Sequence, residues 1–96
     1  MTSTVNALFP LGQIVATPGA LSALGAEGIT PFALLSRHLS GDWGELTQEA
    51  RDENELSLKE GFRIFSAYKL PRTGQRIWVI TEADRSATTL LLPDEY

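Results

Sequence analysis

Hydrophobic and polar residues follow two different periods along this chain, and the period changes near Gly61. Before Gly61 the apolar residues recur at helical spacing, whereas after it they alternate with polar residues over positions 62–69, 76–82 and 87–92. Strict alternation is typical of strands with one buried face. The linkers between these segments are short enough for hairpins. The last third of the chain therefore predicts a three-stranded antiparallel meander.

The register of this meander follows from its two linkers. We place Lys69 opposite Arg76. Arg63 then lies opposite Glu82, so that opposite charges pair on one face. With Glu82 opposite Ala87, the other face gathers the expected core: Phe62, Ile64, Tyr68, Ile77, Val79, Leu90 and Leu92. Because side chains alternate between faces, a one-residue change in either turn would exchange the two faces.

Two short helices are expected in the first half of the chain. Thr17-Pro18 and Thr30-Pro31 each place a capping hydroxyl before a proline at the first helical position. The first helix is expected to run from Pro18 to about Leu24 or Ala26. The second is expected to end near Ser40, with an apolar stripe of Phe32, Leu34, Leu35 and Leu39.

A third helix is expected over residues 45–60, which are strong helix formers and end at Gly61, a favourable C-cap residue. Its apolar positions are sparse, so we expect a largely solvated helix, and Asn54 is a point where it could break or bend. Residues 12–16 predict a brief β-branched strand whose place in the sheet stays open. Residues 1–11 are expected to form a loosely ordered end that anchors through Leu8, Phe9 and Leu11.

Composition limits the chain to one domain. Its 96 residues, 43% of them apolar, suffice for one hydrophobic core without a disulfide or metal. We therefore expect a single α+β domain over residues 1–96: a short N-terminal strand, three helices and the meander. The N-terminus lacks the basic start and long apolar stretch of a signal peptide, and no run of apolar residues is long enough to cross a membrane. A cytoplasmic protein is the expectation.

Residue usage argues against enzyme classes that depend on thiols or metals. The chain has no cysteine and one histidine, so we expect no metal and no cofactor. His38 is expected to cap a helix end, with a ligand or general-base role as the alternative. Glu82 and Asp84 beside Arg85 favour a charged turn, with a hydrolytic carboxylate pair as the alternative. Phosphate-loop and nucleophile-elbow spacings are missing. We predict that the protein is not an enzyme.

Charged residues are unevenly distributed along the chain, whose net charge is -4. Residues 42–60 hold seven acids and two bases, whereas residues 61–85 hold five bases and two acids. One interpretation is a solvated helix and a sheet joined by weak surface pairs. The other is an acidic surface, carried by Glu49, Asp52 and Glu53, that imitates a polyanion or meets a basic partner. The net acidity disfavours direct nucleic-acid or membrane binding.

The two tryptophans are candidate contact residues. Trp43 lies in a turn, where it covers the core or serves as an exposed anchor for a partner. Trp78 shares a sheet face with Phe65, Ile80 and Leu91, as well as with charged residues. Either the segment around Ile14 covers that face, or the face is the surface of a homodimer or of a complex with another protein.

Four segments carry a resemblance to known proteins: residues 11–20 (LGQIVATPGA), 41–44 (GDWG), 77–86 (IWVITEADRS) and 89–96 (TLLLPDEY). Together they resemble a family of small bacterial proteins of plasmids and integrative mobile elements, some of which carry a restriction-related label. The resemblance implies a setting, mobile DNA in a bacterial cytoplasm, and no reaction. Its motifs fall on Trp43, Trp78, Glu82, Asp84 and Arg85.

Two functional hypotheses follow. The first is a non-enzymatic accessory protein of a mobile element that binds a protein partner. The second is an acidic inhibitor that imitates DNA and blocks a host restriction or CRISPR defence complex. The residues expected to contact a partner are Trp43, Phe65, Trp78, Ile80, Leu91, Glu49, Asp52, Glu53 and Arg85.

Overall fold

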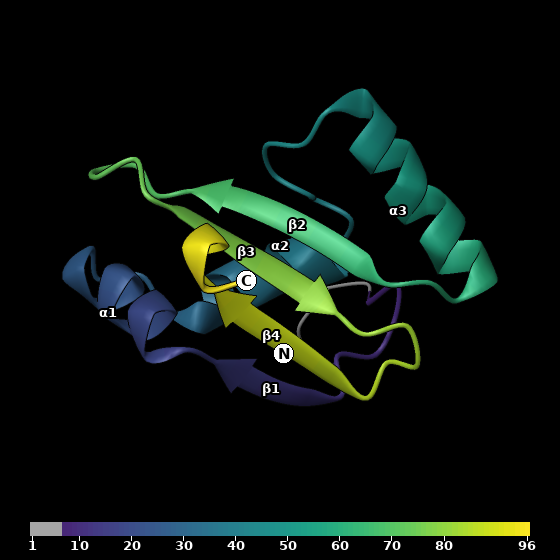
Figure 1. Ribbon diagram of the computed structural model, residues 1–96, viewed down its shortest axis with the longest axis horizontal. Coiled ribbons are helices and arrows are strands. Elements are labelled where there is room, and N and C mark those ends of the chain that lie inside the picture. The colour runs from purple at the N-terminus through teal and green to yellow at the C-terminus, as the bar shows by residue number, and fades with distance from the viewer. Residues whose placement is uncertain (1–6) are drawn as a thin grey trace, which may run out of the picture.

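The computed structural model describes residues 7–96 (Figure 1). Its elements, in chain order, are β1 (Gln13–Ala16), α1 (Pro18–Ala26), α2 (Pro31–Leu39), α3 (Gln48–Glu60), β2 (Ile64–Lys69), β3 (Arg76–Thr81), β4 (Ala87–Leu91) and the 3-10 turn η1 (Pro93–Glu95). This order confirms the predicted α+β fold with an N-terminal strand, three helices and a meander.

The four strands form one mixed sheet in the order β1-β4-β3-β2. The meander is antiparallel, and β1 joins it as an edge strand parallel to β4 (Figure 1). The question that the sequence left open is thereby settled, since residues 13–16 belong to the sheet.

The predicted register is confirmed at both hairpins. Lys69 lies opposite Arg76, and Trp78 lies opposite Leu91. The Arg63 and Glu82 side chains approach to 3.5 Å, as the expected charge pairing requires. Alternation and linker length were therefore sufficient to assign each side chain of β2, β3 and β4 to a face.

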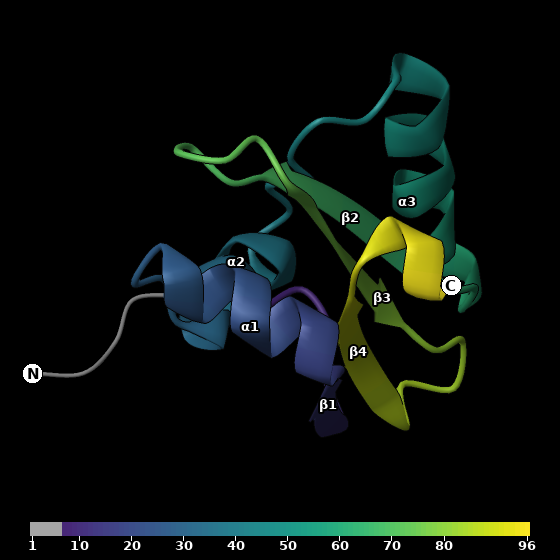
Figure 2. The same cartoon turned by 60° about the vertical axis from the view of Figure 1, so that its left-hand side comes forward.

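Helices α1 and α2 cover one face of the sheet, which we call the helix-covered face (Figure 2). The Thr17 hydroxyl caps α1 by accepting a hydrogen bond from the Ala20 amide, whereas the Thr30 side chain makes no capping bond. Helix α3 begins at Gln48, three residues later than expected, because Thr47 supplies its cap. It ends at Gly61, whose φ of 79° is the left-handed conformation predicted for this C-cap.

The main core lies between the helix-covered face and these two helices. It contains Ala20, Ala23, Leu24, Leu34, Leu35, Tyr68, Leu70, Ile77, Val79 and Leu90. Two residues of the predicted core are not fully buried: Leu92 is partly buried, and Phe62 is 52% exposed. Phe62 lies in the link between Gly61 and β2, so the alternation of the strand does not fix its direction.

A second, smaller core forms where the N-terminal segment crosses the sheet. Phe9, Trp43 and Ile64 are buried together, and Leu11 packs against both cores. Phe9 and Leu11 thus anchor the chain as expected, whereas half of Leu8 is exposed. The rest of the predicted loose end, residues 1–6, lies outside the described part of the chain.

The outer edge of β2 is closed by polar contacts. Ala67 pairs with the backbone of Trp43 and Glu45, and the Asn54 side chain both donates to the Phe65 carbonyl (2.7 Å) and accepts from the Phe65 amide (3.0 Å). Helix α3 is continuous, so Asn54 does not break it as the sequence analysis allowed, and the helix uses Asn54 to pair with the strand.

Candidate functional site

The second face of the sheet, opposite α1 and α2, carries Phe65, Trp78, Ile80 and Leu91, and we call it the aromatic face. The Trp78 ring makes edge-to-face contacts with Phe65 (5.1 Å) and with Tyr96 (5.7 Å). Phe65 and Trp78 are half-buried, whereas Ile80 and Leu91 are only 6% and 7% exposed. Two of the four expected contact residues on this face are therefore inaccessible to a partner.

The C-terminal residues cover part of the aromatic face, in place of the expected segment around Ile14 (Figure 2). Ile14 lies on the opposite face and is 44% exposed. The Glu95 carboxylate accepts hydrogen bonds from the Thr17 hydroxyl (2.6 Å) and the Leu92 amide (2.8 Å), which lower its pKa. Arg63 also donates to the Tyr96 hydroxyl at 2.7 Å. These contacts hold η1 and Tyr96 against the sheet.

Helix α3 presents its acids to solvent. Asn54 and Ser57 form its buried side, and the residues on the opposite side are exposed. Helical spacing places Glu49, Asp52, Glu53, Leu56 and Glu60 along this exposed side, which we call the acidic stripe. Leu56, near its middle, is 46% exposed.

The basic residues of the sheet do not neutralise the acidic stripe. Among residues 7–96, the ion pairs join Arg37 with Asp42, Arg63 with Glu82, and Arg76 with Glu45, so none includes a carboxylate of α3. The charge separation seen in the sequence therefore survives folding as an acidic surface.

Arg85 is occupied within the fold. Its φ is 61°, and its guanidinium donates to the carbonyls of Ser57, Phe62, Glu82 and Ala83 at 2.6–3.1 Å. Ser57 is in the last turn of α3, where the exposed carbonyls attract a cation. Arg85 thus ties the β3–β4 turn to the C-terminus of α3. These contacts leave few of its N–H donors for the expected partner.

Arg85→Lys is expected to lower the free energy of unfolding by about 1–2 kcal/mol, because one ammonium group cannot reach all four carbonyls. Urea unfolding would measure the change. Arg72→Lys is the matched control, since Arg72 is exposed and its side chain makes no hydrogen bond within residues 7–96. Equal stability of the two variants would contradict the assigned role of Arg85.

Trp43 belongs to the core and is 2% exposed. Its ring lies 6.4 Å from Phe9 and 5.9 Å from His38, centroid to centroid. Of the two interpretations of Trp43, the cover over the core is therefore correct, and the exposed anchor is wrong.

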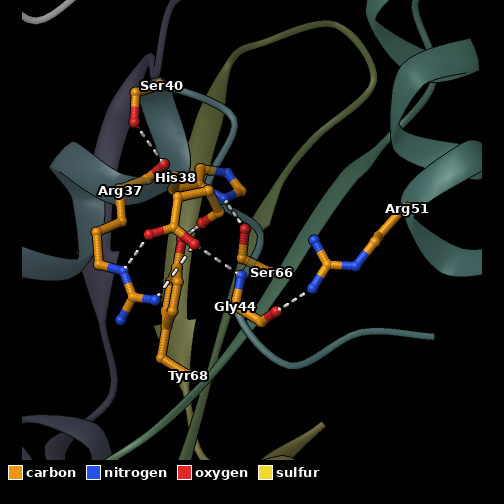
Figure 3. Close-up of polar contacts among 8 residues, drawn as sticks. Arg37, His38, Ser40, Gly44, Arg51, Ser66 and Tyr68 are labelled. Carbon is orange, nitrogen blue, oxygen red and sulfur yellow. Dashed lines mark hydrogen bonds and ion pairs between the residues drawn. The ribbon is translucent and has the colours of Figure 1, made fainter. Parts of the chain in front are cut away.

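His38 is fully buried and lies in a chain of hydrogen bonds, of which Figure 3 shows the one to Ser66. Nδ1 is bonded to the Ser66 hydroxyl, and Nε2 lies 2.9 Å from the Thr81 hydroxyl. Thr81 in turn lies 2.7 Å from the Thr88 hydroxyl, which donates to the Leu11 carbonyl. The expected capping role is wrong, although spacing could have indicated burial, because His38 follows Leu34 and Leu35 at helical intervals.

The direction of each hydrogen bond in this chain follows from counting protons. Thr88 gives its only hydroxyl proton to Leu11, so Thr81 must donate to Thr88. Thr81 then accepts from Nε2–H of His38, and Nδ1 accepts from Ser66. Neutrality of the imidazole follows from its burial, which lowers the pKa of His38 to about 4, so that Nδ1 is an acceptor at pH 7.

Ser66 and His38 have the contact of a nucleophile and a base, but both are fully buried. A substrate could reach neither, and we interpret the pair as part of the core. No pocket is found in the described part of the chain. Residues 7–96 also contain no group of three or more His, Asp or Glu side chains placed to hold a metal ion.

Beside His38, at the end of α2, the Arg37 side chain lies over Tyr68 (Figure 3) and forms an ion pair with Asp42. Arg37 donates to the Asp42 carboxylate at 2.7 Å and lies 4.5 Å above the Tyr68 ring. This hydrogen bond lowers the pKa of Asp42. Asp42 therefore pairs with Arg37, five residues earlier in the chain.

Glu82 and Asp84 are held by separate contacts. Glu82 pairs with Arg63, and Asp84 accepts a hydrogen bond from the Ser86 amide at 3.0 Å. Hydrogen bonds from Ser86 lower the pKa of Asp84. The arrangement is that of a charged turn.

Comparison with family models, with curated proteins and with solved structures found no match. Of the helices within residues 7–96, none is long and apolar enough to cross a membrane.

Proposed function

We propose that this chain is a non-enzymatic accessory protein of a bacterial mobile element, acts in the cytoplasm, and binds a protein partner through the acidic stripe of α3. The observation that carries the proposal is the contrast between arginines and acids. Five of the six arginine side chains make ion pairs or hydrogen bonds within the fold, at Arg37, Arg51, Arg63, Arg76 and Arg85. By contrast, no carboxylate of α3 forms an ion pair with an arginine or lysine within residues 7–96.

The composition of the stripe favours a protein as the partner. Leu56 is an exposed apolar residue with carboxylates on both sides along the helix. An apolar centre with a polar rim is typical of protein interfaces. A basic surface on the partner would complete the electrostatic match and accelerate association. The mobile-element setting rests on the family resemblance of the sequence.

Charge density separates this proposal from DNA imitation. The acids of α3 from Glu49 to Glu60 number five and span about 16 Å of helix. Duplex DNA carries on the order of ten charges over that length. Half that density, on a single helix, is a poor imitation of a duplex and a sufficient match for a basic protein surface.

The test compares two variants of equal net charge. Glu49→Gln/Asp52→Asn/Glu53→Gln removes three charges of the stripe and changes the net charge from -4 to -1. Ser36→Lys/Gln75→Lys/Ala83→Lys produces the same net charge from exposed positions outside α3. Crosslinking in bacterial lysate, followed by mass spectrometry, is expected to identify a partner that the control variant retains and the neutralised variant loses by tenfold or more.

Two outcomes would count against the proposal. Equal capture by the two variants, or crosslinks that avoid α3, would contradict binding through the stripe. If duplex DNA displaces the captured partner and the neutralised variant no longer protects a plasmid from restriction, the DNA-imitating inhibitor is the better description.

A further inference from the structure

The first 26 residues of the chain contain no Asp, Glu, Lys or Arg. Within the described part, this charge-free segment includes β1 and α1. It also carries four of the eight exposed large hydrophobic residues of residues 7–96: Leu8, Ile14, Val15 and Leu21. Although the chain has a net charge of -4, the edge of the sheet at β1 and the adjoining helix α1 are uncharged and carry exposed apolar residues.

Strand β1 lies at an open edge of the sheet (Figure 1). The amide of Gln13 donates to the Ser86 carbonyl (2.9 Å), and the amide of Thr17 donates to the Leu90 carbonyl (3.0 Å). Alternate residues of a strand direct their backbone groups to opposite edges. The N–H and C=O groups of Ile14 and Ala16 therefore point away from β4.

The two edges of the sheet differ. The β2 edge is closed by Asn54 and by the backbone of residues 43–45. The β1 edge is protected only by its shortness, because Gln13–Ala16 contains no charge, no proline and no bulge. Ile14 and Val15 are 44% and 42% exposed, on opposite faces.

We propose that two copies of this chain pair through β1, antiparallel about a two-fold axis at Val15. In this register Ile14 lies opposite Ala16 of the second copy, and the outward groups form four N–H···O bonds. The two Val15 side chains become a non-hydrogen-bonded pair at the axis. The two four-stranded sheets join into one.

Electrostatics identifies a second copy as the occupant. A two-fold contact places a surface against itself, so like charges on that surface oppose association. Among the described elements that carry exposed hydrophobic residues, β1 and α1 are the ones without charge. Because β1 is short, the interface must extend to neighbouring residues to approach the about 800 Å² per partner of a standard interface. Leu21 on α1 lies on the same side of the sheet as Ile14 and is 48% exposed.

The dimer is independent of the proposed function, because β1 and α3 lie at opposite edges of the sheet (Figure 1). Sedimentation equilibrium of the full chain is expected to show a dimer whose fraction rises with concentration. Val15→Lys places two like charges at the axis and is expected to remain monomeric throughout. Leu56→Lys is the matched control, with 46% exposure against 42%. It is expected to dimerise as the unmodified chain does.

A monomeric unmodified chain at all concentrations, or equal behaviour of the two lysine variants, would overturn the proposal. Because the chain has no cysteine, single cysteines give a second test that does not depend on weakening the fold. Paired Cα atoms at a non-hydrogen-bonded position are about 4.5 Å apart, within the range of a disulfide. Val15→Cys is expected to form a disulfide dimer at least tenfold faster than Leu56→Cys. Equal rates would contradict the two-fold pairing at Val15.

Hydrogen exchange reports on the same contact without any substitution. The Ile14 and Ala16 amides should become protected as concentration rises, whereas the Gln13 and Thr17 amides should be protected at every concentration. Exchange of Ile14 and Ala16 that does not depend on concentration would also overturn the proposal.

Discussion

Lowering the pH from about 6.5 to 4 is expected to reduce the free energy of unfolding by about 1.4 kcal/mol per pH unit through His38 alone. The unfolded chain binds a proton at His38 below pH 6.5, whereas burial lowers the pKa in the folded chain to about 4. The contribution of neutral His38 to stability is therefore fully present above about pH 6.5 and is lost as the pH falls toward 4. The full loss is about 3 kcal/mol.

The measurement is urea unfolding at half-unit intervals from pH 7.5 to pH 4.5. The carboxyl groups with lowered pKa, such as those of Asp42 and Glu95, act in the same direction but start from ordinary values near 4. The interval from pH 6.5 to pH 5 therefore isolates His38.

His38→Gln supplies the control for this slope. Glutamine has a donor and an acceptor but does not titrate, so the variant should be less stable at pH 7 and should have almost no pH slope between 6.5 and 5. An unchanged slope in His38→Gln would show that another group is responsible. Nitrogen-15 spectra of the ring provide a direct check, because the hydrogen-bond chain places a proton on Nε2 and the lowered pKa leaves Nδ1 without one at pH 7.

The sheet could be predicted from the sequence because the patterns that specify it lie within short segments of the chain. Alternation from Ile64 to Leu91 and two short linkers decide faces and register without reference to the rest of the chain. The helix starts at Pro18 and Pro31 depend on equally local signals. Phe62 was misassigned because the alternation was extended past the point where the strand begins.

The contacts that define the surfaces depend on residues far apart in the chain. Glu95 reaches Thr17, and Thr88 reaches Leu11, across more than 70 positions in each case. No period or spacing connects such pairs. Residues 93–96 have no pattern that would place them over Trp78, and so the covering of the aromatic face could not be predicted.

His38 and Arg85 show why candidate chemistry was harder to predict than the fold. Both residue types are frequent in functional sites, and both are satisfied internally in this chain. Only the acids of the predicted contact set keep their charge exposed and without an ion pair within residues 7–96. The helical spacing that predicted α3 also indicated that Glu49, Asp52 and Glu53 would share its solvent side.

Asn54→Ala is expected to lower the free energy of unfolding by about 2–4 kcal/mol, a large effect for a side chain on a polar helix. Asn54 is 2% exposed and provides both a donor and an acceptor to Phe65. Truncation leaves the Phe65 amide and carbonyl unpaired at a covered edge of β2. Urea unfolding at pH 7 measures the loss.

Glu55→Ala is the matched control, because Glu55 is the exposed neighbour of Asn54 on the same helix. It should change stability by less than about 0.5 kcal/mol. Equal effects of the two alanine variants would mean that water satisfies Phe65 and that the edge is not closed by Asn54.

Asn54→Asp separates hydrogen bonding from shape. An aspartate accepts from the Phe65 amide but cannot donate to the Phe65 carbonyl, and burial penalises its charge. A protonated aspartic acid recovers the donor, so its folded pKa should be raised and this variant alone should become more stable, relative to the unmodified chain, as pH falls from 7 to 5. That trend is opposite to the one that His38 produces. It would show that α3 is attached to the sheet through the paired bonds of Asn54, which leave the acids on its other side exposed to solvent.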